Sequence, residues 1–232
     1  MSSTKIPRIA NRLLAALPKK DFEALERHME EVPLILEEIL YQPRLLISDV
    51  YFPNSGIVSL LAAANGRATL EVGLVGKEGL LGLAVFMGVN TSQNRAVVQG
   101  AGSAMKMKAT AFRKECNNGS ALTRILQRYS HSLLTQITQS AVCNQFHSVD
   151  ARLARWLLMT HDRMGDDEFA LTQEFLSNML GVRREGVSRA AGDLQKRKLI
   201  QYSRGNVRIL DRPGLEATSC GCYEIIKDES NS

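Results

Sequence analysis

The chain has 232 residues, of which 44% are hydrophobic and 23% are charged. This composition is typical of a globular protein and excludes a low-complexity or disordered chain. The net charge of +5 is unevenly distributed: residues 183–212 hold nine Lys/Arg and three acids, a net +6, so the rest of the chain sums to −1. A basic segment on a near-neutral body is typical of nucleic-acid-binding proteins.

The sequence lacks the signals of a secreted or membrane protein. No apolar run reaches the roughly 18 residues that a membrane helix needs, and the first twenty residues hold no continuous apolar core of a secretory signal. The cysteines are too few and too scattered for a disulfide framework. We therefore expect a cytoplasmic protein with reduced thiols and no membrane partner. The four cysteines are Cys116, Cys143, Cys220 and Cys222.

The hydrophobic period changes along the first half of the chain. Residues 11–40 carry apolar side chains at helical spacing, which predicts helices there. From residue 45 to residue 108 the period is two: Leu70, Val72 and Leu74 alternate with smaller or polar residues, and Asn65-Gly66 is a hairpin signal. Several short strands separated by turn signals predict a small barrel or sandwich.

A long helix follows, because no Gly or Pro occurs between residues 120 and 164. Its apolar residues recur every three or four positions and form one stripe. A long helix with such a stripe is typical of a dimer interface; packing against the chain's own barrel is the alternative. The stripe consists of Leu122, Leu126, Tyr129, Leu133 and Ile137. A domain boundary is expected near residue 148.

The segment 171–209 predicts a helix-turn-helix. Thr172 is a good N-cap for a first helix, which Gly181 ends, and a second helix follows from Arg184 to about Lys198. The second helix of this motif enters the DNA major groove with its N-terminal residues on base edges. Arg can bond guanine bidentately, and Glu can accept a hydrogen bond from cytosine. The expected base contacts are Arg184, Glu185, Ser188 and Arg189, of which the last three share one helix face.

A basic hairpin follows the second helix. Residues 199–203 and 206–210 bracket Arg204-Gly205, which predicts the wing of a winged helix. The alternative is a structural helical pair with a charged surface hairpin. The residues expected to contact DNA phosphates are Thr172, Arg183, Arg204 and Arg208.

The sequence resembles the Crp/Fnr transcription regulators over most of its length. Residues 171–176 and 181–189 resemble their helix-turn-helix, residues 51–58 a strand pair of their β-roll, and residues 79–82 their phosphate-cassette turn. The resemblance implies an α+β fold, with an N-terminal β-roll of the double-stranded β-helix, cupin-like type and a C-terminal winged helix-turn-helix. The expected parts are a sensor domain (11–118), a dimerisation helix (119–147), a DNA-binding domain (148–217) and a C-terminal tail (218–232).

The same resemblance implies a function. A homodimer would bind double-stranded DNA at an inverted repeat and act with RNA polymerase, as an activator or a repressor and not as an enzyme. Glu185-x-x-Ser188-Arg189 resembles the pattern of the Fnr branch, which implies a TTGA-like half-site. The alternative is a ligand-binding or cupin-like enzyme domain with a helical unit that does not bind DNA, but no nucleophile–base set or phosphate-binding glycine loop supports an enzyme.

An effector would bind the β-roll, but the sequence disfavours a cyclic nucleotide. Leu80 stands where the resemblance implies an acid for the ribose, and Ala96 where it implies Ser or Thr for the phosphate. A buried ribose diol would then lack an acceptor, at a cost of roughly 1–3 kcal/mol. The candidate effector positions are Gly79, Leu80, Gly82, Arg95 and Ala96.

No metal or cofactor is expected with certainty. An iron–sulfur cluster of the Fnr type is not expected, because the first cysteine is Cys116 rather than one of an N-terminal group. Cys220 and Cys222 form a close pair, but two thiols do not complete a four-ligand site, so a reduced, incidental pair is expected. Cys143 is assigned to packing, and the four histidines, as singletons on helical stretches, do not suggest a metal cupin.

Overall fold

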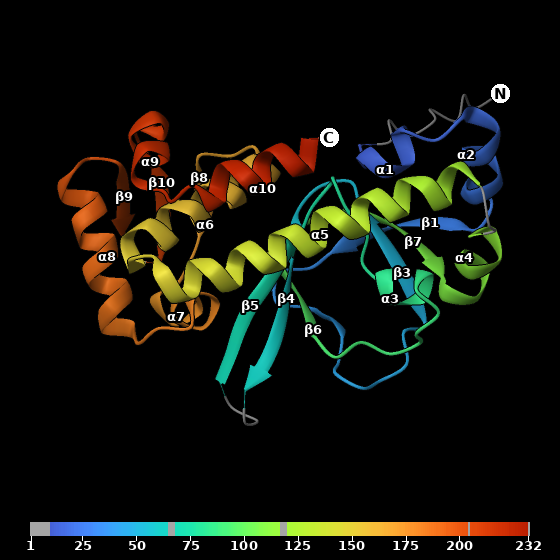
Figure 1. The fold of residues 1–232 in the computed structure, drawn as a ribbon, viewed down its shortest axis with the longest axis horizontal. Helices are drawn as coiled ribbons and strands as arrows, with labels where there is room; N and C mark the ends of the chain where they lie inside the picture. Colours follow the sequence, from blue (N-terminus) through green and yellow to red (C-terminus); the bar gives the residue numbers. More distant parts are fainter. Residues whose placement is uncertain (1–9, 65–67, 117–119, 204, 232) are drawn as a thin grey trace.

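A computed structural model describes residues 10–64, 68–116, 120–203 and 205–231. Figure 1 shows an N-terminal β-rich domain, a long helix that crosses the molecule, and a C-terminal domain of short helices. The two domains are named by their expected roles, the sensor domain and the DNA-binding domain. This order of parts is the one expected from the sequence.

The N-terminal segment is helical over only part of its predicted length. After α1 (Arg12–Ala15) and α2 (Lys19–Glu26), the chain forms β1 (Met29–Leu34) and β2 (Ile39–Tyr41). The helix predicted to reach residue 40 is therefore wrong beyond α2. β1 is extended because it pairs along its whole length with β7 (Gly102–Lys108), which buries Leu34.

The sensor domain consists of two antiparallel sheets. One has the order β1-β7-β3 and the other the order β2-β6-β4-β5. Their apolar faces enclose a core that includes Phe52, Val98 and Phe112. The short strands predicted between residues 45 and 108 are confirmed as β3 to β7; the Asn65-Gly66 turn lies outside the described residues. The remaining elements are β3 (Asp49–Pro53), β4 (Ile57–Ala64), β5 (Ala68–Val75), α3 (Leu83–Phe86), β6 (Arg95–Gly100) and α4 (Ala109–Glu115).

Helix α5 (Ala121–Phe146) corrects the predicted dimer stripe. Leu122, Leu126 and Tyr129 are buried in the sensor core of their own chain, and Leu133 packs partly against it. Leu122, Leu126 and Tyr129 are therefore unavailable to a partner, and the alternative of packing against the barrel holds for these three. Ile137 is half-buried. The large apolar side chains that α5 exposes are Leu134, Val142 and Phe146.

The DNA-binding domain follows a break in the helix at His147 and Ser148. It contains α6 (Val149–Met164), β8 (Glu168–Ala170), α7 (Gln173–Leu180), α8 (Arg184–Lys196), β9 (Ile200–Ser203), β10 (Asn206–Ile209) and α9 (Arg212–Thr218). The strands form a sheet in the order β8-β10-β9. None of the helices among the described residues is long and apolar enough to span a membrane.

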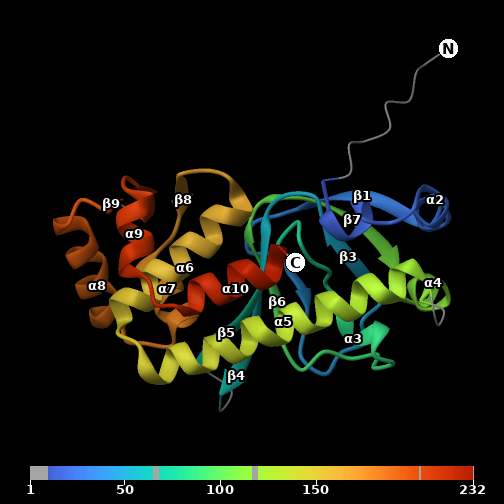
Figure 2. The same ribbon diagram turned by 45° about the horizontal axis from the view of Figure 1, so that its top comes forward.

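Residues 218–232, expected to be a tail, contain a packed helix. α10 (Cys222–Asn231) turns back from the DNA-binding domain and lies against α5 and α6, with Tyr223 and Ile226 buried (Figures 1 and 2). The C-terminal helix thus returns the chain to the long helix from which the DNA-binding domain starts.

The two domains share one hydrophobic core. Ile57, Leu61 and Leu74 of β4 and β5 pack in the same cluster as Trp156 of α6 and the helices of the DNA-binding domain. Polar contacts cross the same boundary: the Trp156 indole donates to Glu71 Oε1 at 2.8 Å. The arrangement of the two domains is therefore held by buried contacts as well as by the chain.

A second polar contact across the boundary is an ion pair. Arg163 Nε lies 2.7 Å from Glu78 Oε1, and both side chains are largely buried. Removing one partner of a buried pair leaves an uncompensated charge, which costs roughly 3–5 kcal/mol. This pair therefore opposes separation of α6 from the sensor domain.

Candidate nucleic-acid interface

The turn between α7 and α8 is specified by its caps. The Thr172 hydroxyl accepts a hydrogen bond from the Phe175 backbone N–H at 3.1 Å, which closes the first turn of α7. Gly181 ends that helix with φ +60, a conformation that glycine adopts without strain. A Cβ atom there would also lie 2.7 Å from the Leu70 side chain, so glycine permits both the turn and the close approach of β5.

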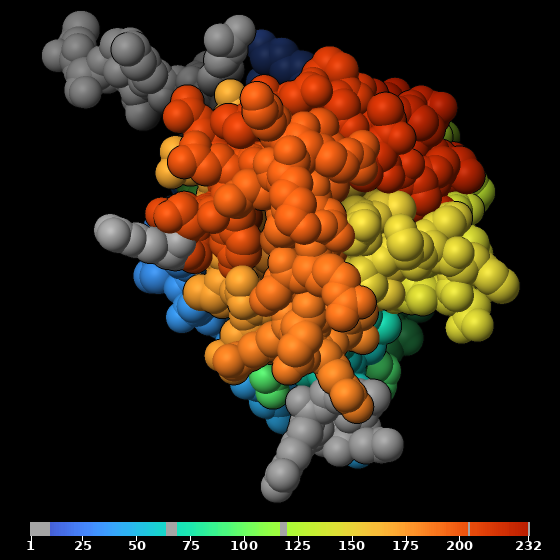
Figure 3. Space-filling model, turned by 90° about the vertical axis from the view of Figure 1, so that its left-hand side faces the viewer, coloured from blue at the N-terminus to red at the C-terminus, as the bar shows by residue number. Residues whose placement is uncertain are grey.

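Helix α8 has one buried and one exposed face. Val187, Ala190, Ala191 and Leu194 are buried in the domain core. The residues expected to contact bases lie on the exposed face: Arg184, Glu185, Ser188 and Arg189. In Figure 3 the orange atoms of this region lie across the middle of the viewed face of the DNA-binding domain. The face is accessible to an external ligand.

Two of these side chains contact α7. Arg184 Nη2 lies 2.5 Å from Glu174 Oε2, with both side chains more than half exposed, and the Ser188 hydroxyl donates to Gln173 Oε1 at 2.8 Å. The ion pair is solvent-exposed, so it contributes at most about 1 kcal/mol and can be exchanged for another anion or acceptor. Arg184 is therefore held beside α7 by a weak ion pair, which another acceptor can replace.

The predicted wing is confirmed as the β9–β10 hairpin, which β8 extends to a three-stranded sheet. Arg208 is exposed on β10, and Thr172 and Arg183 are exposed at the starts of α7 and α8. The Tyr202 hydroxyl donates to the Leu171 carbonyl at 2.9 Å and so ties the wing to the start of the helix-turn-helix. Arg204, the other predicted phosphate contact on the wing, lies outside the described residues.

Residues 151–218 match the family model described as the Crp-like helix-turn-helix domain. The chain carries a Crp-like helix-turn-helix domain. The match covers α6 through α9, that is, the helix pair, the wing and the helices that support them. The exposed face of α8 thus lies within the matched helix-turn-helix domain.

Solved structures share the fold over 82% to 83% of the chain. FixK2 from Bradyrhizobium japonicum is similar with a TM-score of 0.71 and 17% identity, covering 83% of this chain and 98% of that one. The c-di-GMP-responsive global regulator CLP of Xanthomonas campestris has a TM-score of 0.67 and 16% identity, covering 83% and 99%. A CRP/FNR-family transcriptional regulator from Thermus thermophilus has a TM-score of 0.64 and 19% identity, covering 82% and 98%.

A search of curated protein sequences found no match. The chain thus combines a Crp-like helix-turn-helix domain with a fold shared with CRP/FNR-family regulators. The neighbours from Xanthomonas campestris and Thermus thermophilus are regulators, the class expected from the sequence, rather than cupin-like enzymes.

The candidate effector positions do not form a polar pocket. Leu80 and Ala96 are buried among core residues, and neither side chain has a polar atom to bind a ribose or a phosphate. Arg95 is exposed at the start of β6. Gly79 lies under Tyr129: a Cβ there would be 2.5 Å from the Tyr129 hydroxyl, which donates to the Leu80 carbonyl at 3.2 Å.

Tyr129 thus packs on the loop where the resemblance places a nucleotide. Its burial raises the pKa of the phenol well above the usual value, so it stays a neutral hydrogen-bond donor. Gly82 supplies a positive φ of 98 just before α3. The loop serves packing between the sensor sheets and α5.

A group of side chains that the sequence interpretation treated separately lies at the end of α5. Cys143 and His147 approach Cys220 and Cys222, and the four ligand atoms lie within 4.8 Å of one another. The sequence interpretation treats Cys143 as a packing residue and Cys220 and Cys222 as an incidental pair, each separate from the other. The structure shows that separation to be wrong. Two signals were available: a Cys-x-Cys pair, and a Cys and a His four residues apart on one helix.

Proposed function

We propose that this regulator binds an inverted-repeat DNA operator as a homodimer, with α8 of each subunit in the major groove. The observation that carries the proposal is the exposed face of α8, where Arg184, Glu185, Ser188 and Arg189 project from a helix whose other side is buried. A helix-turn-helix dimer contacts two half-sites about 34 Å apart, which is one turn of DNA. The half-sites proposed are TTGA-like.

The side chains on α8 suit base contacts of two kinds. Arg189 can donate two hydrogen bonds to guanine, and Glu185 can accept one from cytosine N4. Arg184 and Ser188 already contact Glu174 and Gln173, so DNA binding would exchange these contacts for others. Thr172, Arg183 and Arg208 lie at exposed positions suited to phosphate.

The proposed dimer face lies on the C-terminal half of α5. Leu134, Val142 and Phe146 expose large apolar side chains there, with exposed fractions of 61%, 38% and 74%. Spacings of eight and four residues place them on one side of a helix. Exposed apolar side chains grouped on one face are typical of a protein interface.

The test measures binding of full-length protein to selected DNA. Purified protein is incubated with random genomic fragments at a stated salt concentration, and the enriched sequence is used in titrations with Arg189→Ala and Arg27→Ala. Both variants lose one arginine, but Arg27 is exposed at the end of α2 in the sensor domain. We expect Arg189→Ala to lose about 1–3 kcal/mol of binding per half-site, roughly five- to 150-fold, and to relax preference at one base.

Two outcomes would contradict the proposal. One is equal operator affinity for Arg189→Ala and the wild type; the other is enrichment of no inverted repeat. Arg208→Ala serves as a separate check, because loss of a phosphate contact should weaken binding to all sequences. It should also reduce the slope of log affinity against log salt concentration by about 0.9 per contact.

A further inference from the structure

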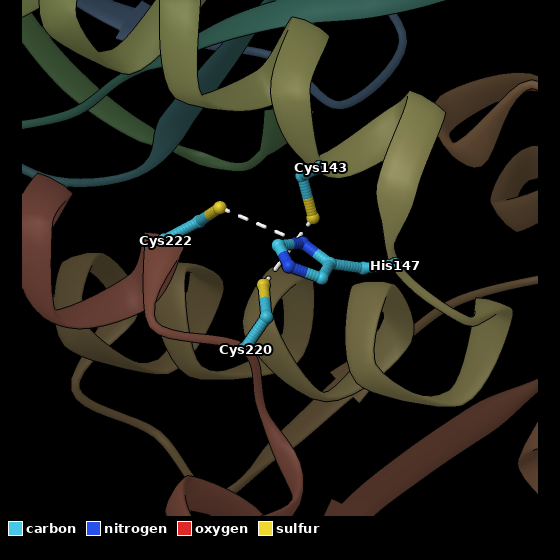
Figure 4. A group of neighbouring side chains, drawn as sticks. All are labelled: Cys143, His147, Cys220 and Cys222. Atoms are coloured by element: carbon cyan, nitrogen blue, oxygen red, sulfur yellow. Dashed lines mark hydrogen bonds between the residues drawn. The ribbon is translucent and has the colours of Figure 1, made fainter.

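Three cysteines and one histidine converge where the DNA-binding domain joins α5 (Figure 4). Cys143 lies in the last turn of α5 and His147 is its C-cap residue. Cys220 and Cys222 flank Gly221 at the start of α10. Cys143 Sγ lies 3.4 Å from Cys220 Sγ, and Cys222 Sγ lies 3.7 Å from His147 Nδ1.

The geometry suits four ligands around one ion. In a tetrahedral site with Zn–S bonds of about 2.3 Å and a Zn–N bond of about 2.0 Å, neighbouring ligand atoms lie about 3.5 to 3.8 Å apart. The Cys143 Sγ–Cys220 Sγ and Cys222 Sγ–His147 Nδ1 separations, 3.4 and 3.7 Å, are close to these values. A polynuclear iron–sulfur cluster spreads its thiolates over several iron atoms, whereas these four ligand atoms all lie within 4.8 Å of one another.

The local structure favours this convergence. Residues four apart on a helix lie on the same face, so the end of α5 directs Cys143 and His147 to one side. α9 ends at Thr218, and the chain then reverses into α10, which packs on α5. The reversal brings the Cys-x-Cys pair to the helix end. The Cys143 and Cys222 side chains are buried, which excludes bulk water from much of the site.

A buried positive charge lies beside the cluster. Arg152 of α6 is buried, its Nε has no hydrogen-bond partner, and the acidic groups that face it include the thiols of Cys143 and Cys220. Three thiolates and a neutral imidazole around a divalent cation carry a net charge of −1. Such a site would supply the counter-charge that the guanidinium needs, since buried charges are costly unless paired.

We propose that Cys143, His147, Cys220 and Cys222 bind one zinc-type divalent cation. Binding would release three thiol protons and form three metal–sulfur bonds and one metal–nitrogen bond, with no oxidation or reduction. All four positions are protein ligands, so the site is closed and structural rather than catalytic. It would join the residue just before the DNA-binding domain to the segment just after it, and so hold that domain against α5.

The experiment uses full-length protein, reduced and stripped of metal with a chelator. Anaerobic titration with Co²⁺ should give the intense visible bands of tetrahedral thiolate ligation, saturate at one ion per chain, and lose those bands on addition of one equivalent of Zn²⁺. Cys220→Ser should weaken binding by roughly a hundredfold or more. Cys116→Ser is the matched control, because Cys116 ends α4 in the sensor domain and lies outside the cluster.

A second measurement tests whether the bound metal stabilises the fold. Zn²⁺ should raise the thermal midpoint of the wild type and of Cys116→Ser but not that of Cys220→Ser. Cys220 is preferred over the buried Cys143 because it is only half-buried, so its variant is expected to fold. Absence of tetrahedral bands, a chromophore with several irons per chain after reconstitution, or a Cys143–Cys220 disulfide in place of metal would each overturn the proposal.

Discussion

The two halves of α5 use the same kind of side chain for different contacts. In the N-terminal half, Leu122, Leu126 and Tyr129 close the core of the sensor domain. In the C-terminal half, Leu134, Val142 and Phe146 are exposed. Between the two halves, the buried Gln136 amide bonds both backbone groups of Leu74 at the edge of β5. Apolar residues at one helical spacing can therefore form two different surfaces, one that packs in the chain's own core and one that stays exposed and available to a partner.

The largest effect is expected from truncation in the N-terminal half. Leu126 is fully buried, so Leu126→Ala should lower the free energy of unfolding by about 2–5 kcal/mol through lost transfer energy and a cavity. Denaturant unfolding, extrapolated to low protein concentration so that assembly does not contribute, measures this loss. Leu134→Ala is the matched control, and its 61% exposure predicts a change within about 0.5 kcal/mol. Equal losses would remove the distinction between the halves.

Glu71 lies on β5, the strand that packs beside α5. Burial raises the pKa of Glu71 to about 7, although Ser59 and Trp156 donate hydrogen bonds to the carboxylate. Because the folded pKa exceeds the unfolded value of about 4.5, the contribution of Glu71 to stability is complete below pH 4.5 and is lost as pH rises through 7. The loss is at most about 3 kcal/mol.

Glu71→Gln should remove this pH dependence while keeping an acceptor for the Trp156 indole. The measurement is the difference in unfolding free energy between the wild type and the variant from pH 5 to pH 8.5. We expect the wild type to lose stability relative to the variant as pH rises. A difference that stays constant with pH would show that the carboxyl group is solvated and that the boundary between the domains is less well packed than the structure indicates.

The smallest effect is expected on assembly, from the C-terminal half. If Phe146 packs in a dimer, Phe146→Ala should weaken dimerisation by about 1–2 kcal/mol per dimer, or five- to thirtyfold in the dissociation constant. Sedimentation velocity over a range of concentrations measures it. Gln127→Ala, an exposed position on the other half of α5, is the control. An unchanged dissociation constant for Phe146→Ala would place the dimer face elsewhere.

Much of the DNA-binding domain could be predicted from local chemistry. Thr172, Gly181 and the alternation on either side of Gly205 act within a few residues, so caps and turns specify α7, α8 and the wing. β1 could not be predicted in the same way, because its sequence alternates weakly and its pairing with β7 is a long-range contact. For α5, periodicity identifies apolar faces but not what covers them. Spacing alone therefore cannot distinguish a stripe that packs in the sensor core from one that contacts a second subunit.

The two candidate sites also differ in whether local sequence or long-range packing determines them. The proposed base-contacting residues Glu185, Ser188 and Arg189 lie within about one helical turn, and their common face follows from spacing alone. The cysteine and histidine cluster combines two segments that lie on opposite sides of the DNA-binding domain in the sequence. Only the packing of α10 on α5 brings them together, and no local pattern encodes that packing.

The hydrophobic core shared by β5 and the DNA-binding domain has a consequence for signalling. Ile57, Leu61 and Leu74 belong to the same cluster as the buried residues of α8, so the N-terminal sheets and the proposed recognition helix are adjacent parts of one packed unit. Any rotation of the DNA-binding domain must first separate these side chains and the Arg163–Glu78 pair. An effector could reverse a 99:1 population of the two arrangements only by binding the rotated one about 10⁴-fold more tightly. The strength of this internal contact therefore sets the minimum selectivity that any activating signal must have.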